Sequence, residues 1–186
     1  MNKVLYIKAN IKPEGQSRTF RISDNFIEEY KKNNPNDEVT VLDLYKEGID
    51  FLRPEDLQAV FGEKTEESKK HPILKYAYQI AEADKIVIAT PMWNLGTPAI
   101  VKAYFDYVSV TGITFKYTAQ GPVGLCKASK ALIVSGRGGD YSNPITKELV
   151  KDIKSVAAEN LDVIGIDVEK IVTDEISEAK EIAKNF

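Results

Sequence analysis

The stretch IVIATPMWNLG, residues 86–96, joins an apolar run to a loop of unusual composition. The run Ile86–Ala89 is unbroken, which is typical of a strand buried on both faces of a parallel sheet. After Pro91 comes a loop with a sulfur, an indole and an amide, made of Met92, Trp93, Asn94 and Leu95. Ligands of parallel α/β sheets bind beyond the carboxyl ends of strands. The stretch therefore predicts a parallel α/β sheet with a flat aromatic ligand in this loop.

Strand and helix patterns alternate along the rest of the chain, which favours a parallel sheet with helices on both faces. Strands are predicted at residues 4–7, 39–42, 86–89, 131–134 and 168–172, and helices at 17–33, 73–80, 98–112, 143–157 and 176–183. Thr97 is predicted to cap the third of these helices, with Pro98 at its first position. Residues 48–70 are predicted to form a partly helical surface excursion, and residues 113–124 a small hairpin outside the sheet.

Composition limits the classes of partner. The 186 residues are 43% hydrophobic and contain no repeat or linker, so we expect one domain spanning residues 1–186. The net charge of −3 offers no broad basic surface, so neither nucleic acid nor an anionic membrane is expected as a partner. Prolines in the longest uncharged run, residues 86–101, exclude a plain membrane helix. A single cysteine, Cys126, and the lack of a signal-peptide pattern predict a cytoplasmic location.

Three strand ends carry unusual loops, at residues 9–17, 91–96 and 135–143, and a parallel sheet places all three at one edge. The first loop enters a helix through Gly15, Gln16 and Ser17, where free N–H groups can hold a phosphate without a lysine. Taken alone, each loop has a simpler interpretation: Ser17 as a cap, Trp93 as core packing, and the glycine loop as a flexible turn. Their combination indicates a site for a mononucleotide with a flat tricyclic ring.

Four segments resemble one known family. They are NKVLYIKANIKPEGQS (2–17), ATPMWNLGTPAIVKAYFDYV (89–108), GITFKYTAQGPVGL (112–125) and KALIVSGRGGDY (130–141). In order and spacing they resemble the FMN-dependent NADH azoreductases, a branch of the flavodoxin-like quinone reductases. The resemblance implies a flavodoxin-like five-stranded parallel sheet of order 2-1-3-4-5. It also implies a homodimer with flavin sites near the interface, and two-electron, ping-pong reduction of quinones and azo compounds by NADH through FMN.

The resemblance also assigns residues to the flavin. Gly15, Gln16 and Ser17 match the segment that holds the FMN phosphate; Met92, Trp93, Asn94 and Leu95 match the segment along the isoalloxazine ring; and Gly136, Arg137, Gly138 and Gly139 match the loop at its other side. Asn10, also expected at the cofactor, stands where a serine is common, and Gly15 likewise replaces a serine. Trp93 and Tyr117 are expected to wall the substrate pocket.

No side chain is assigned a catalytic role, because hydride transfer takes place at N5 of the flavin. No metal site is predicted, and His71 and Cys126 are interpreted as residues outside the chemistry. Two alternatives remain open: a flavodoxin-like electron carrier, and a flavin-free binding protein with the same fold. The aromatic pair Phe115 and Tyr117 is expected to pack either on a partner subunit or on its own domain.

Overall fold

The protein is described here by a computed structural model that covers residues 1–67, 70–139, 161–162, 164–172 and 176–186. Its centre is a parallel sheet in which β1 (Lys3–Lys8) lies between β2 (Glu38–Asp43) and β3 (Lys85–Ala89). On the far side of β3 lies β6 (Lys130–Val134), which pairs with β7 (Asp167–Val172), so the strand order is β2-β1-β3-β6-β7. The predicted α/β fold around a parallel sheet is confirmed.

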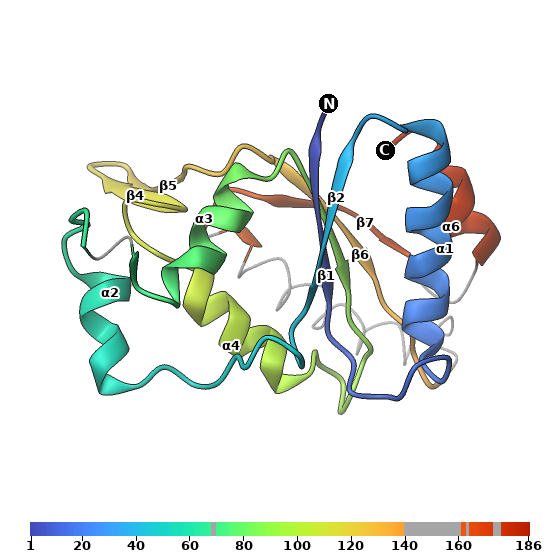
Figure 1. Ribbon diagram of the computed structural model, residues 1–186, viewed down its shortest axis with the longest axis horizontal. Coiled ribbons are helices and arrows are strands. Elements are labelled where there is room, and N and C mark those ends of the chain that lie inside the picture. Colours follow the sequence, from blue (N-terminus) through green and yellow to red (C-terminus); the bar gives the residue numbers. More distant parts are fainter. Residues whose placement is uncertain (68–69, 140–160, 163, 173–175) are drawn as a thin grey trace.

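Helices cover both faces of the sheet (Figure 1). Helices α1 (Arg18–Asn33) and α6 (Ile176–Ala183) lie on one face, and α3 (Leu74–Glu82) and α4 (Ala99–Val108) on the other. Successive strand residues point to opposite faces. In β1, Val4 and Tyr6 therefore join the core under α1 and α6, while Leu5 and Ile7 join the core under α3 and α4. The helix predicted at residues 143–157 lies outside the described residues.

Helix α1 forms as its sequence predicts. The Ser17 side chain accepts a hydrogen bond from the Phe20 backbone N–H at 3.0 Å, which satisfies one of the free donors of the first turn. One face of the helix is buried, and two lysines lie in the last turn, where their charge is favourable to the helix dipole. The helix axis is thereby fixed with its positive end at the carboxyl edge of the sheet.

Helix α4 differs from its prediction at both ends. It begins at Ala99, preceded by Pro98 in an extended conformation (φ −54°, ψ 144°), and Thr97 does not cap it. The helix ends at Val108 rather than at Gly112, because the Thr114 hydroxyl donates to the Val108 carbonyl at 2.6 Å and turns the chain away. One of the free carbonyl groups at the end of this helix thus accepts a hydrogen bond from a side chain that lies outside the helix.

The remaining elements lie outside the main sheet. The excursion contains a 3-10 turn (η1, Pro54–Asp56) and a short helix (α2, Leu57–Phe61), which confirms its partly helical character. Strands β4 (Phe115–Thr118) and β5 (Gly121–Gly124) form the predicted hairpin. Within the described residues, no helix has the length and apolar character needed to cross a membrane.

Candidate functional site

Backbone hydrogen bonds join the three loops beyond the carboxyl ends of β1, β3 and β6. The Ala9 N–H donates to the Ala89 carbonyl at 2.9 Å, and the Thr90 N–H donates to the Val134 carbonyl at 3.0 Å. Further out, the Met92 N–H donates to the Gly136 carbonyl at 3.0 Å. These bonds extend the parallel ladder past the strands. The structure therefore brings the predicted loops side by side, as far as the third loop is described.

Gly136 connects the third loop to the start of α1. Its N–H donates to the Thr19 hydroxyl at 3.2 Å, and a Cβ added at Gly136 would lie 2.5 Å from the same oxygen. Thr19 is buried, so a side chain at Gly136 would force a shift in either the loop or the packed start of α1. Thr19 was not among the predicted site residues. Its signal was a polar residue in the buried helical stripe that continues through Ile22 and Phe26.

The first loop reaches α1 through a tight turn. The Gln16 N–H donates to the Pro13 carbonyl at 3.1 Å, and Gly15, the third residue of this turn, has a φ of +76°. A turn of type II requires a positive φ at this position, which glycine adopts without steric cost. The amide N–H groups of the first α1 turn follow directly, at the positive end of the helix. This arrangement suits an anion with several acceptor oxygens.

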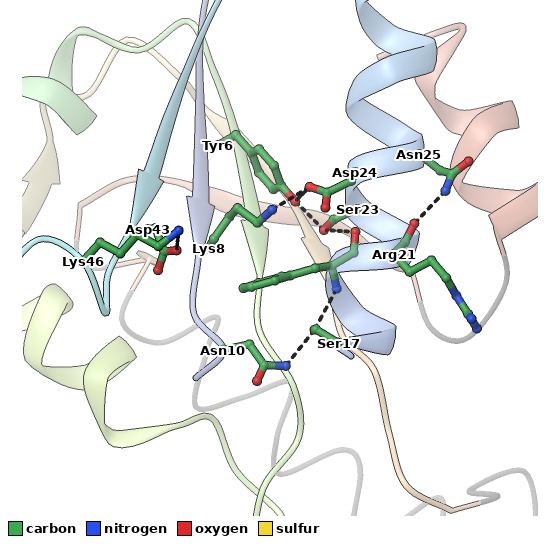
Figure 2. Close-up of polar contacts among 11 residues, drawn as sticks. Tyr6, Lys8, Asn10, Ser17, Arg21, Ser23, Asp24, Asn25, Asp43 and Lys46 are labelled. Carbon is green, nitrogen blue, oxygen red and sulfur yellow. Dashed lines mark hydrogen bonds and ion pairs between the residues drawn. The ribbon is translucent and has the colours of Figure 1, made fainter. Parts of the chain in front are cut away.

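Asn10 and Ser17 form the buried floor of the first loop (Figure 2). The Asn10 amide donates from Nδ2 to the Ser17 Oγ at 2.8 Å, and both residues are buried. The predicted N-cap role of Ser17 is confirmed by its bond from the Phe20 N–H. The cap does not use up the hydroxyl, which still carries a proton that can be donated.

The positive charge nearest the end of β1 is directed toward α1. The Lys8 Nζ lies 2.7 Å from the Asp24 Oδ1 and 4.3 Å from the centroid of the Phe20 ring. Figure 2 shows Lys8, Asp24 and Tyr6 together on the α1 side of β1. Burial raises the pKa of Tyr6, whose hydroxyl also donates to Asp24. This lysine is therefore committed to an ion pair, as expected for an anion site built from backbone groups.

The middle loop is a tight two-residue turn. The Trp93 N–H donates to the Gly96 carbonyl at 2.9 Å, and the Gly96 N–H returns the bond at 3.0 Å. Between them, Asn94 and Leu95 both have positive φ angles, 51° and 60°. This is the pattern of a type I′ turn, which asparagine tolerates and leucine does not. Strained backbone of this kind is found at sites where geometry matters for function.

The site residues of the middle and third loops differ in exposure. Met92 and Trp93 are half-buried, whereas Asn94 and Leu95 are exposed. In the third loop Gly136 and Arg137 are half-buried, and Gly138 and Gly139 are exposed. In both loops the two residues further from the strand are thus the exposed ones.

The hairpin residue Tyr117 lies on β4, outside these loops. Its ring contacts Phe115 edge to face, with centroids 5.4 Å apart, and 72% of the residue is exposed. Phe115 is only 6% exposed and belongs to the core under α3 and α4. The domain therefore covers Phe115 itself, which was one of the two expected arrangements, and leaves Tyr117 to the solvent.

A sequence model described as the flavodoxin-like fold matches residues 2–185. The chain belongs to this family. An FMN-dependent NADH:quinone oxidoreductase of Clostridium beijerinckii is 61% identical to it, over 100% of both chains. An azoreductase structure from Bacillus anthracis is 33% identical, covers 100% of both chains and has a TM-score of 0.84. The family predicted from the four sequence segments is confirmed.

A second solved structure is informative about the cofactor. It is an FMN-dependent NADH-azoreductase from Bacillus anthracis in complex with FMN, 25% identical, with a TM-score of 0.81 and coverage of 100% of this chain and 99% of that one. The residues of the present chain fit such a group. The positive φ of Gly15 allows the turn before α1, and the buried Ser17 hydroxyl has a proton that it can donate to a phosphate oxygen. Gly136 allows the third loop to approach α1 closely.

Proposed function

We propose that the protein is an FMN-dependent NADH:quinone oxidoreductase with azoreductase activity. The observation that carries this proposal is the 61% identity over the full length of a relative with that name, on a chain whose three loops lie side by side at the carboxyl edge of the sheet. Azoreductase structures at 33% and 25% identity extend the proposal to azo compounds. FMN is proposed as the bound cofactor and NADH as the electron donor.

In this proposal each loop has its own part of the cofactor to hold. The phosphate lies at the start of α1, held by Asn10 and by the segment Gly15–Ser17. The ring lies along Met92–Leu95, and the segment Gly136–Gly139 borders its other side. Bound FMN supplies two-electron transfer. The protein positions NADH and then the acceptor in turn over the same ring face, so turnover is ping-pong.

Protein groups near the ring act by orientation and by hydrogen bonding. The turn at Asn94 fixes backbone N–H groups and a side-chain amide where they can bond to the ring edge. No ionisable side chain is proposed as a catalytic acid or base. In the described residues no group of three or more metal-ligating side chains gathers, so nothing there points to a metal.

The deciding experiment is an absorption spectrum of the purified protein reconstituted with FMN, before and after anaerobic addition of NADH. We expect a flavin spectrum that bleaches with NADH and returns when a quinone is added. A protein that binds no flavin would be the flavin-free alternative. A bound flavin that NADH fails to reduce would instead favour the electron carrier.

We also propose that the protein is a homodimer with its flavin sites near the interface. Support comes from large apolar side chains exposed outside the sheet: Phe51 at 71%, Phe61 at 66% and Tyr117 at 72%. Aromatic side chains at this exposure are stabilised when a partner covers them. Tyr117 would then wall the substrate pocket across the interface, opposite Trp93. Sedimentation of the wild type and of Tyr117→Ala, with the Michaelis constant for quinone, tests both parts; a monomer with unchanged kinetics would refute them.

Two finer points complete the proposal. We propose that the whole chain is one domain with the sheet order 2-1-3-4-5, in which only the strands of the main sheet are counted, so that β6 is the fourth and β7 the fifth. The pairing of β6 with β7 supports this order. A cytoplasmic location is proposed because Cys126 is a free thiol, which suits a reducing compartment. Burial raises the pKa of this thiol to about 11, which keeps it protonated and unreactive.

A further inference from the structure

Asn10 and Ser17 are linked by a hydrogen bond whose direction is fixed. The Asn10 Oδ1 accepts the Lys12 backbone N–H at 3.0 Å. Because a backbone N–H can only donate, the atom that faces it must be the amide oxygen. The other end of the amide is therefore the NH2 group, which donates to the Ser17 Oγ at 2.8 Å.

The Ser17 oxygen accepts a second hydrogen bond. The Phe20 N–H donates to it at 3.0 Å as part of the N-cap. A hydroxyl oxygen has two lone pairs and one proton, so both acceptor positions of Ser17 are occupied. Within the described ranges no residue accepts the remaining proton, although Ser17 is only 3% exposed. The Ser17 hydroxyl can therefore take part in a further hydrogen bond only as a donor.

We propose that Asn10 is a positioning residue that makes the Ser17 hydroxyl a pure donor, so that the first loop selects the dianionic phosphate of FMN over its protonated form. This inference rests on the proposed function, in which the FMN phosphate lies at the start of α1. The N–H groups of the first α1 turn are also donors only. A protonated phosphate oxygen needs an acceptor, and neither the Ser17 hydroxyl nor these N–H groups can act as one. The second ionisation of a phosphate ester lies near pH 6.

Other charged residues lie near this pair in the chain, and their charges act on any anion bound at the first loop. Lys12, Glu14 and Arg18 are exposed neighbours in the chain, and Lys8 is paired with Asp24 at 2.7 Å. They act on FMN in the wild type and in every variant below. Their effect therefore cancels when variants are compared at the same pH, and differences report on Asn10 alone.

The test measures dissociation constants for FMN and for riboflavin, which lacks the phosphate, by quenching of flavin fluorescence between pH 5 and pH 8. Asn10→Ala removes the donor and frees one lone pair of Ser17. Asn25→Ala is the matched control, because Asn25 also donates its amide, to the Arg21 carbonyl at 2.8 Å, but on the exposed face of α1 (Figure 2).

For the wild type we expect FMN to bind about tenfold more weakly at pH 5 than at pH 8, as the dianion is lost, with riboflavin binding unchanged. At pH 8, Asn10→Ala should bind FMN about tenfold more weakly than the wild type does. Its loss of affinity on acidification should be smaller, because Ser17 can now accept a phosphate proton. Asn10→Asp should weaken FMN binding further. The new carboxylate would accept the hydrogen bond from the Ser17 hydroxyl, which then could not donate to the phosphate, and its negative charge would repel the phosphate.

Riboflavin separates an effect on the phosphate from an effect on the fold, because it binds without a phosphate. If Asn10→Ala weakened FMN and riboflavin equally, the residue would serve the fold and the proposal would be wrong. An unchanged FMN affinity, or a pH profile parallel to that of the wild type, would also overturn it. Failure of the wild type to bind FMN would refute the proposed function itself, and this inference with it. An Asn25→Ala protein that behaved like Asn10→Ala would show that the effect is not specific to Asn10, which would also overturn the proposal.

Discussion

Asn94 and Leu95, at the carboxyl edge of the sheet, have left-handed backbone conformations, whereas at the amino edge Asp37 is held by short hydrogen bonds in an ordinary turn. Asp37 accepts from the Asn2 N–H at 2.7 Å, from the Asn2 Nδ2 at 2.9 Å and from the Tyr30 hydroxyl at 2.6 Å. The amino edge therefore fastens the ends of β1, α1 and β2 together. The carboxyl edge instead has strained backbone at Asn94 and Leu95, and the Ser17 hydroxyl there donates to no described residue.

The difference between the edges indicates a division of roles. Groups at the amino edge satisfy one another, so changing them should affect stability and leave ligand binding intact. We expect the groups at the carboxyl edge to be arranged for a ligand at some cost to stability. Substitutions at the two edges should thus have separable effects, and the following predictions test that separation in order of expected size.

Gly136→Ala should give the largest effect, and on FMN binding. The new Cβ would lie 2.5 Å from the Thr19 hydroxyl, and Thr19 is buried. The third loop must then move away from α1 and the cofactor site opens, which should weaken FMN binding about a hundredfold, or roughly 3 kcal/mol. Titration with FMN measures the loss.

Gly138→Ala is the control in the same loop. A Cβ at Gly138 would meet no protein atom within 4 Å, so the loop should stay in place, and FMN binding should fall by no more than about tenfold even though this residue borders the proposed ring site. Equal losses at Gly136 and Gly138 would show that loop flexibility, and not the contact with Thr19, determines the affinity.

Asp37→Asn should reduce stability by about 2 kcal/mol, because the NH2 group that replaces one carboxylate oxygen cannot accept the hydrogen bonds from Asn2 or Tyr30 that this oxygen accepted. The hydrogen bond from the Tyr30 hydroxyl, followed by the bonds from Asn2, lowers the pKa of Asp37 to about 2. The lowered pKa means that its contribution is complete above about pH 4 and is lost as the pH falls toward 2. Urea unfolding at several pH values measures it.

In the variant, the part of the acid destabilisation that belongs to Asp37 should disappear, while FMN binding at pH 7 stays as in the wild type. Asp106→Asn is the matched control, since its ion pair with Lys102 is exposed on α4 and is worth less than about 1 kcal/mol. Loss of FMN affinity in Asp37→Asn would show that the two edges are coupled.

Local sequence patterns were sufficient for most of the fold. Apolar runs located the strands, and Ser17 was recognised as a helix start because its cap depends on a residue three positions away. Thr97 and Pro98 failed as a helix start. Pro98 has an extended backbone and stands before the helix, so the two residues signal the boundary one position too early. The end of the same helix depends on Thr114, which a local pattern cannot reveal.

The candidate site was predictable as a set of loops and not as a set of contacts. The four segments placed the loop residues in one family, which the comparisons confirmed. The contact between Gly136 and Thr19 joins residues 117 positions apart, and Asn10 meets Ser17 only after the intervening chain has turned. Leucine gives no turn signal, so the conformation of Leu95 also had to come from the structure.

The smallest predicted effect concerns Leu95. Its φ of +60° places a branched side chain in a region that costs about 1 to 2 kcal/mol, while 47% of the residue is exposed, so packing returns little of that cost. Leu95→Asn should therefore stabilise the FMN-free protein by about 0.5 kcal/mol, because asparagine tolerates this backbone. Leu95→Val should destabilise it by about 1 kcal/mol, since branching at Cβ makes the same backbone harder to adopt. Urea unfolding of the FMN-free proteins gives the order. If valine proved as stable as asparagine, the strain at this edge would be absent from the protein in solution, and the contrast with Asp37 would then rest on hydrogen bonding alone.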